Sequence, residues 1–163
     1  MARAKATFPV EGGCTCRFVR YLVMTKPLFV HCCHCTWCQR ETGSAFVLNA
    51  MIETERVRIL GGAPETVVTP SASGKGQKIM RCPKCHVAVW SHYPGAGLKV
   101  AFVRVGTLDR PELCSPDIHI FTSTKQPWVI LSDKVPIRKT YYEREKLWPT
   151  ESLKRLAAVA ETS

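Results

Sequence analysis

The sequence predicts a single, mainly β domain that ends in one short helix. Short runs rich in valine, isoleucine, leucine, phenylalanine and tyrosine recur along the chain, and pairs such as Gly12-Gly13 and Gly61-Gly62 separate them. The chain has 163 residues, of which 45% are hydrophobic and 22% charged. That is enough for one core but cramped for two. The clearest helical spacing of apolar residues lies near the C-terminus.

The N-terminal half is expected to form short strands after a basic leader, residues 1–10. The strand-like runs are residues 17–25, 28–31, 45–52 and 57–60. Between the second and third runs, the polar residues 36–42 are compatible with one helical turn that ends at Gly43. Residues 70–76 are expected to form a flexible loop.

Strands are expected again after this loop, at residues 77–81, 87–92, 99–105, 119–121 and 128–131. A helix is expected at about 151–160, because Leu153, Leu156 and Ala160 fall on one face and Pro149 precedes it. We therefore divide the chain into the leader, a domain at 11–131 and a C-terminal extension at 132–163. The helix can pack on its own domain or on a second subunit, so a homo-oligomer is compatible with the sequence.

The nine cysteines indicate metal binding in a reducing compartment. An odd number cannot be fully paired within one chain, and no apolar run approaches the roughly 20 residues of a membrane span. The N-terminus also lacks the apolar stretch of a secretory signal. We therefore expect a cytoplasmic protein with no membrane partner, in which closely spaced cysteines are metal ligands.

The first cysteine set joins two close pairs, Cys14 with Cys16 and Cys82 with Cys85. Residues i and i+2 of a strand point to the same face, and a C-x-x-C turn also presents two sulfurs together. Four thiolates complete the tetrahedral shell of a structural zinc. Because the pairs lie 66 residues apart (82 − 16), such a zinc would join the two halves of the chain. A disulfide within the C-x-C pair would be strained.

The second cysteine set lies in the segment HCCHCTWC, residues 31–38. Strand alternation places Cys33 and Cys35 on one face, and a turn can bring Cys38 back to them. Three thiolates without an obvious fourth partner are typical of a catalytic zinc with an open position. In the alternative, a fourth ligand closes the site: His31, His34 or Cys114. Cys32 and Cys114 are otherwise expected to be buried, and His34 to pack nearby.

A zinc ion held by three thiolates carries a net charge of −1, so it should acidify water less than a three-histidine zinc does. It favours a soft fourth ligand and keeps a bound thiol deprotonated. The expected substrate is therefore a small thiol or thiol adduct, which the zinc positions and polarises.

The formal charge of +10 (23 − 13) suits an anionic partner. The basic residues are spread along the chain, however, and we find no recognition helix or stacking motif. Binding of nucleic acid is therefore disfavoured. A zinc-containing nucleic-acid-binding module or a structural interaction module remains the alternative to an enzyme.

Five segments together resemble the family of glutathione-dependent formaldehyde-activating enzymes, which also includes centromere protein V. They are GGCTCRFVRY (12–21), PLFVHCCHCTWCQRETGSAFVLNA (27–50), SGKGQKIMRCPKCHVAVW (73–90), VRVGTLD (103–109) and HIFTSTKQPW (119–128). The resemblance runs in order over about residues 11–131. Three features depart from the family pattern. His86 stands where the family usually has glycine, Cys32 is an extra cysteine, and the C-terminal extension lies outside the matched region.

The resemblance implies a β-tent of small antiparallel sheets that a structural zinc staples together. It also implies two zinc ions per chain, a structural one at Cys14, Cys16, Cys82 and Cys85 and a catalytic one at Cys33, Cys35 and Cys38. The implied activity is that of a carbon–sulfur lyase that forms S-hydroxymethylglutathione from formaldehyde, with glutathione as co-substrate. We add four candidates for the substrate rim: Arg40, His119, Lys125 and Trp128.

Overall fold

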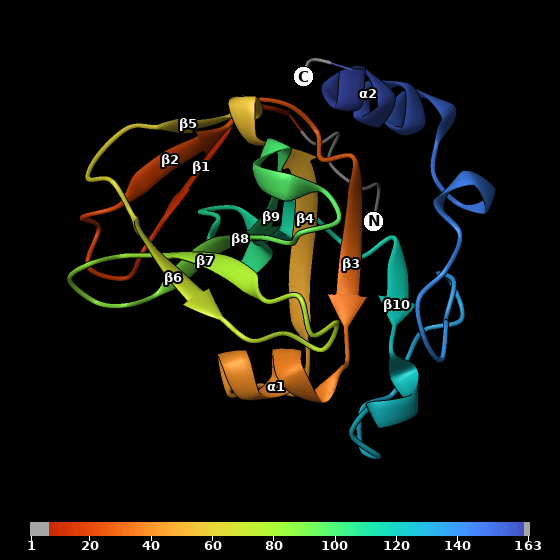
Figure 1. Cartoon of the computed structure of the whole chain (residues 1–163). Helices are drawn as coiled ribbons and strands as arrows, with labels where there is room; N and C mark the ends of the chain where they lie inside the picture. Colours follow the sequence, from red (N-terminus) through yellow and green to blue (C-terminus); the bar gives the residue numbers. More distant parts are fainter. Residues whose placement is uncertain (1–6, 162–163) are drawn as a thin grey trace.

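The computed structural model describes residues 7–161 (Figure 1). Within these residues, ten strands form two sheets and two α-helices accompany them, so the mainly β class with a short C-terminal helix is confirmed. Residues 1–6 of the expected leader lie outside the described residues. None of the described helices has the length and hydrophobicity that a membrane span requires.

The smaller sheet has three antiparallel strands. Their order is β1 (Val10–Gly13), β2 (Arg20–Val23) and β5 (Val57–Ile59). The strand expected at 17–25 is therefore shorter at both ends. Arg17 adopts a positive φ of 63° and its N–H donates to the carbonyl of Cys14, so the chain turns there before β2 begins.

The larger sheet has seven strands. Their order is β10 (Ile118–Ile120), β3 (Phe29–Cys33), β4 (Val47–Glu53), β9 (Val100–Arg104), β8 (Ala88–His92), β7 (Gln77–Arg81) and β6 (Glu65–Thr69). All neighbours are antiparallel except β10 and β3, which are parallel. The strands β1 and β6 were not among the expected ranges.

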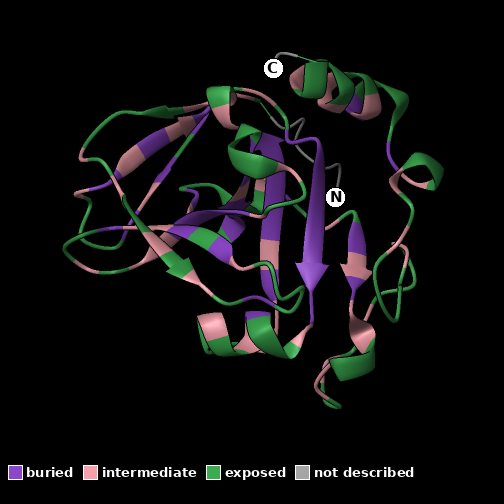
Figure 2. Ribbon diagram, viewed as in Figure 1, coloured by how far each residue is buried: buried purple, intermediate pink, exposed green. Residues whose placement is uncertain are grey.

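Strand β3 is buried along its whole length, as Figure 2 shows. Its side chains alternate between two cores. Val30 belongs to the core shared with the smaller sheet, whereas Phe29 and Cys33 belong to a second core that includes Trp148 of the C-terminal extension. A strand covered on both faces has apolar residues without alternation, which explains the run PLFV before the cysteines.

The two α-helices confirm the helical expectations. Helix α1 (Thr36–Thr42) begins after Cys35, whose sulfur accepts from the Cys38 N–H, and ends at Gly43 with a φ of 65°. Helix α2 (Thr150–Glu161) packs Leu153 and Leu156 against the second core. The C-terminal extension thus covers the outer side of β3 and β10 (Figure 1).

The strand expected at 128–131 is wrong. These residues belong to no strand, and the side chains of Trp128 and Ile130 are 72% and 94% exposed. Their β-propensity has no effect because no neighbouring strand is available to pair with them. For the same reason Trp128 contributes nothing to the core.

Candidate metal centres and the adjoining pocket

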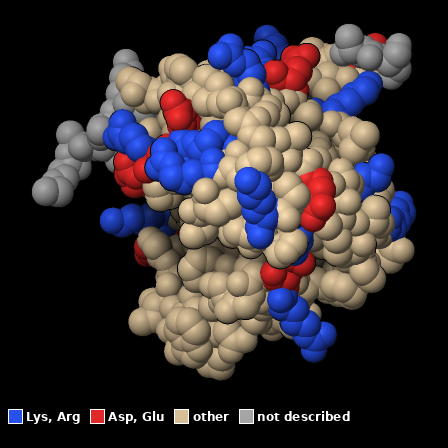
Figure 3. Space-filling model, turned by 90° about the vertical axis from the view of Figure 1, so that its left-hand side faces the viewer, with Lys and Arg blue, Asp and Glu red and all other residues tan. Residues whose placement is uncertain are grey.

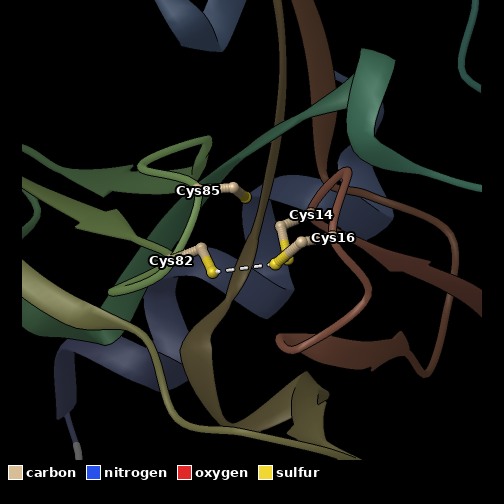
Figure 4. A group of neighbouring side chains, drawn as sticks. All are labelled: Cys14, Cys16, Cys82 and Cys85. Carbon is tan, nitrogen blue, oxygen red and sulfur yellow. Dashed lines mark hydrogen bonds between the residues drawn. The ribbon is translucent and has the colours of Figure 1, made fainter.

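The structure brings the first cysteine set together. Cys14 and Cys16 follow β1, Cys82 and Cys85 form the turn after β7, and the four sulfurs lie within 4.8 Å of one another (Figure 4). The Sγ–Sγ distances are 3.5 Å for Cys14–Cys16 and 3.7 Å for Cys16–Cys82. Zinc–sulfur bonds of about 2.3 Å place the sulfurs of a tetrahedral site about 3.8 Å apart. The spacing therefore fits a zinc ion.

Backbone N–H groups point at these sulfurs. Val19 donates to Cys14 Sγ at 3.3 Å, and Lys84 donates to Cys82 Sγ at 3.4 Å. A backbone hydrogen bond from Val87 is the main reason why the pKa of the Cys85 thiol falls to about 6. Such donors stabilise thiolates, the form of cysteine that binds metal.

His86 occupies a special backbone position in this turn. Its φ is 60°, and its N–H donates to the carbonyl of Cys82. This left-handed conformation favours glycine. The geometry agrees with the glycine that the resemblance leads one to expect at this position, where this chain has histidine.

The second cysteine set also comes together. Cys33 ends β3, Cys35 caps α1 and Cys38 lies in its first turn, with the three sulfurs within 4.8 Å of one another. Cys38 N–H donates to Cys35 Sγ at 3.4 Å. Hydrogen bonds from the thiols of Cys33 and Cys38 lower the pKa of Cys35 to about 2, and the same contact raises the pKa of Cys33.

No fourth Cys, His, Asp or Glu of residues 7–161 joins these three sulfurs in one cluster. The three candidates for closing the site have other surroundings. His31 shares a 2.5 Å hydrogen bond with the Tyr142 hydroxyl, His34 belongs to a different cluster, and Cys114 is buried in the first core. Three sulfurs with an open side therefore describe this site.

A third cluster lies on the opposite face of β3 from Cys33. His34 Nε2 lies 3.4 Å from Cys32 Sγ and 3.0 Å from His119 Nδ1. Burial, with a further contribution from His119, lowers the pKa of His34 to about 4, so both contacts involve a neutral ring. Strand alternation places Cys32 and His34 on one face, a signal that could have revealed this cluster.

A cavity of about 390 Å³ opens over the second cysteine set. That volume is sufficient for a small molecule. All three cysteines line it, whereas the first set does not. Its other walls come from α1, the inner strands of the larger sheet, the loop around Ser71–Lys75, the turn after β8 and the C-terminal extension, which contributes Tyr141 and Arg144.

The cavity wall includes a buried cation that the sequence analysis missed. Arg104, at the end of β9, is only 6% exposed and donates hydrogen bonds to Asn49 Oδ1 and, at 3.0 Å, to Ser91 Oγ. Its Nε has no partner in residues 7–161. A signal was present in the sequence, because Arg104 is the one charged residue in the apolar run VAFVRV.

The four rim candidates lie elsewhere. None of Arg40, His119, Lys125 and Trp128 lines the cavity. Lys125 Nζ instead donates to the backbone carbonyls of Gln126 and Val129, at 2.9 and 2.7 Å, and His119 lies in the third cluster. The polar and aromatic residues that line the cavity with the cysteines include Asn49, Tyr93, Arg104, Tyr141 and Arg144.

Comparison with known proteins places the chain in a family. The model of the glutathione-dependent formaldehyde-activating enzyme family matches residues 9–124, a span that includes both cysteine sets. No curated protein matches the chain. One similar solved structure, a crystal structure of a Rhodobacter sphaeroides protein, is 17% identical with a TM-score of 0.47, and covers 78% of this chain and 98% of its own. On the strength of the family match, this chain belongs to the glutathione-dependent formaldehyde-activating enzyme family.

Proposed function

We propose that this protein is a zinc-dependent carbon–sulfur lyase that joins a small thiol to an aldehyde, with glutathione and formaldehyde as the first pair to test. The observation that carries the proposal is the contrast between its two cysteine sets. One set has four sulfurs and lies away from the cavity, whereas the other has three and lines it. A closed set suits a structural zinc and an open set suits a catalytic one.

The donor sets fit zinc in both places. We assign a structural zinc to Cys14, Cys16, Cys82 and Cys85, and a catalytic zinc to Cys33, Cys35 and Cys38. When bound at the second set, zinc would supply a Lewis acid that holds the substrate sulfur as a thiolate. The reaction forms a carbon–sulfur bond, and the thiol proton ends on the former carbonyl oxygen, so no oxidant is required.

The residues of the chain have separate tasks in this scheme. The cysteines would hold the zinc ion, and with it the reacting sulfur, at one end of the cavity, and Arg104 offsets the negative charge near Cys38. Trp148 Nε1 donates to the Tyr142 oxygen at 2.7 Å, so the Tyr142 hydroxyl proton is available for His31 Nε2. Burial lowers the pKa of His31 to about 4, and this neutral ring fixes the wall of the cavity.

The nine cysteines are all unpaired, which agrees with a reducing compartment such as the cytoplasm. Nucleic-acid binding has less support. On the face drawn in Figure 3, lysine and arginine side chains lie at several separate places with acidic ones beside them. A nucleic-acid site would instead gather them into one patch or stripe.

The test is the exchange rate between glutathione and its formaldehyde adduct, measured by NMR above the spontaneous rate. We expect wild type and Cys114→Ala to accelerate exchange, because Cys114 belongs to neither cysteine set. Cys38→Ala should remain folded and lose the acceleration. Full activity of Cys38→Ala with glutathione and with other small thiols would refute the proposal.

A further inference from the structure

The geometry points to an anion-binding subsite in the cavity, formed by Arg104 of β9 and Arg144 of the C-terminal extension, that binds a carboxylate of the thiol substrate. This inference rests on the proposed function and adds to it the two residues that would select a thiol carrying a carboxylate over one without. It also gives the C-terminal extension a role, because the family model ends at residue 124 and Arg144 lies beyond it.

Arg104 is the first reason. A buried guanidinium is costly unless an anion faces it. Arg104 is hydrogen-bonded to the neutral groups of Asn49, Ser91 and Tyr93, and no carboxylate of residues 7–161 forms an ion pair with it. Its Nε is also buried without a hydrogen-bond partner in these residues. Apart from the negative charge near Cys38, the chain thus keeps in the cavity wall a cation that no carboxylate of these residues balances.

The charge balance of the cavity is the second reason. The Lys, Arg, Asp and Glu residues that line it are Glu41, Lys75, Arg104 and Arg144. Glu41 forms an ion pair with Arg81 outside the cavity wall, which leaves three positive charges. A zinc ion on three thiolates contributes −1 (2 − 3), so a charge of about +2 (3 − 1) remains to attract an anion.

The anchoring of the C-terminal extension is the third reason. The Trp148 ring stacks on Phe29 of β3 with a centroid distance of 5.3 Å, and Tyr142 is hydrogen-bonded to both Trp148 and His31. Arg144 lies between these two anchors in the chain, with its guanidinium 5.9 Å from the Trp148 ring centroid. An arginine held in this way loses less side-chain entropy when it binds a ligand.

Two tyrosines, Tyr141 and Tyr93, lie between the arginines and the three cysteines of the cavity. Tyr141 stacks on Tyr142 at 4.9 Å, lines the cavity and interacts electrostatically with both Cys33 and Arg144. Tyr93 interacts electrostatically with Cys33 and Cys38, and it shares a hydrogen bond with Arg104. The two arginines are therefore both neighbours of side chains next to the cysteine trio. A substrate sulfur at the trio would leave its carboxylate within the field of these arginines.

The test compares two thiols that differ in one group, 3-mercaptopropionate and 3-mercapto-1-propanol, by calorimetric titration into the zinc-loaded full chain. We expect wild type to bind the acid at least tenfold more tightly than the alcohol, because a charge-assisted hydrogen bond contributes about that factor. Arg144→Gln should abolish most of this preference and leave binding of the alcohol unchanged. Lys146→Gln, an exposed neighbour that lies outside the cavity, should behave as wild type.

Equal binding of acid and alcohol by wild type would overturn the inference, and so would an unchanged preference in Arg144→Gln. Arg104→Lys provides a second variant that keeps the charge but removes the planar fork, and it should weaken acid binding about fivefold. Failure of the proposed function would be seen in a different measurement, the rate of aldehyde exchange. In that case neither glutathione nor 3-mercapto-1-propanol would show accelerated aldehyde exchange, whatever the preference for the acid.

Discussion

The attachment of helix α2 provides the sharpest prediction about stability. The Glu53 side chain at the end of β4 is only 2% exposed, and Arg155 donates two hydrogen bonds to its carboxylate, at 2.8 and 2.6 Å. Arg56 lies 3.3 Å from the same carboxylate. The substitution Arg155→Ala would leave a buried carboxylate with one partner. It would also remove one attachment of helix α2, whose Leu153 and Leu156 would still pack against the second core.

The expected cost follows from this geometry. Removing one partner of a buried ion pair costs about 3–5 kcal/mol. The Arg155 side chain is 18% exposed and Arg56 remains, so we expect the lower end, about 3 kcal/mol. For a chain of this size, that corresponds to a fall in Tm of about 6–12 °C.

The assay is urea and thermal unfolding of wild type, Arg155→Ala and Lys154→Ala. Lys154 is exposed on the same helix, so its loss changes the net charge equally but should cost less than about 0.5 kcal/mol. A cost below 1 kcal/mol for Arg155→Ala would refute the reasoning.

The same pair should make stability depend on pH. Burial acts to raise the pKa of Glu53, but the hydrogen bonds from Arg155 and the backbone, together with the charges of Arg155 and Arg56, outweigh it and hold the pKa below its ordinary value. The stabilisation is therefore complete above the unfolded pKa of about 4.3 and is lost as the pH falls through the folded value. The difference between wild type and Arg155→Ala should shrink below about pH 4.

Three further predictions concern other parts of the structure. Cys82→Ser should lose the zinc of the first set and unfold, since structural zinc contributes folding energy directly; circular dichroism with zinc analysis checks this, and a folded variant would count against it. His86→Val should be less stable than His86→Gly by about 1–2 kcal/mol in urea, because φ at this position is 60°; equal stabilities would contradict the turn geometry. Tyr142→Phe should lower the free energy of unfolding by about 1–3 kcal/mol, because it leaves both His31 and Trp148 without their hydrogen-bond partner. Thermal unfolding measures this loss, and an unchanged Tm would show that neither hydrogen bond stabilises the fold.

The cysteine sets could be predicted from sequence because their geometry is local. A C-x-C pair and a C-x-x-C turn can present their sulfurs together with little help from the rest of the fold, and Cys33 and Cys38 are also close in sequence. The meeting of the Cys14 pair with the Cys82 pair is tertiary, and it was expected because four thiolates complete a zinc site. The mainly β class was predictable for a similar reason, since turn residues separate the apolar runs.

The cavity residues could not be predicted in this way because tertiary packing selects them. Arg104 and Asn49 are partners across the β4–β9 ladder, and only that register places them together. Tyr141 and Arg144 reach the cavity from about 100 residues beyond the cysteines, through the packing of Trp148 on Phe29. Trp128 shows the converse, because an aromatic residue in a strand-like run is exposed when no strand pairs with it.

The most direct test of the account is the amount of zinc per chain in freshly purified protein, by elemental analysis with protein counted independently. The account predicts two zinc ions for wild type and one for Cys38→Ala, with that variant still folded. Wild-type protein that held one zinc, and a Cys38→Ala variant that held the same amount, would contradict the assignment of a catalytic zinc to the three cysteines of the cavity.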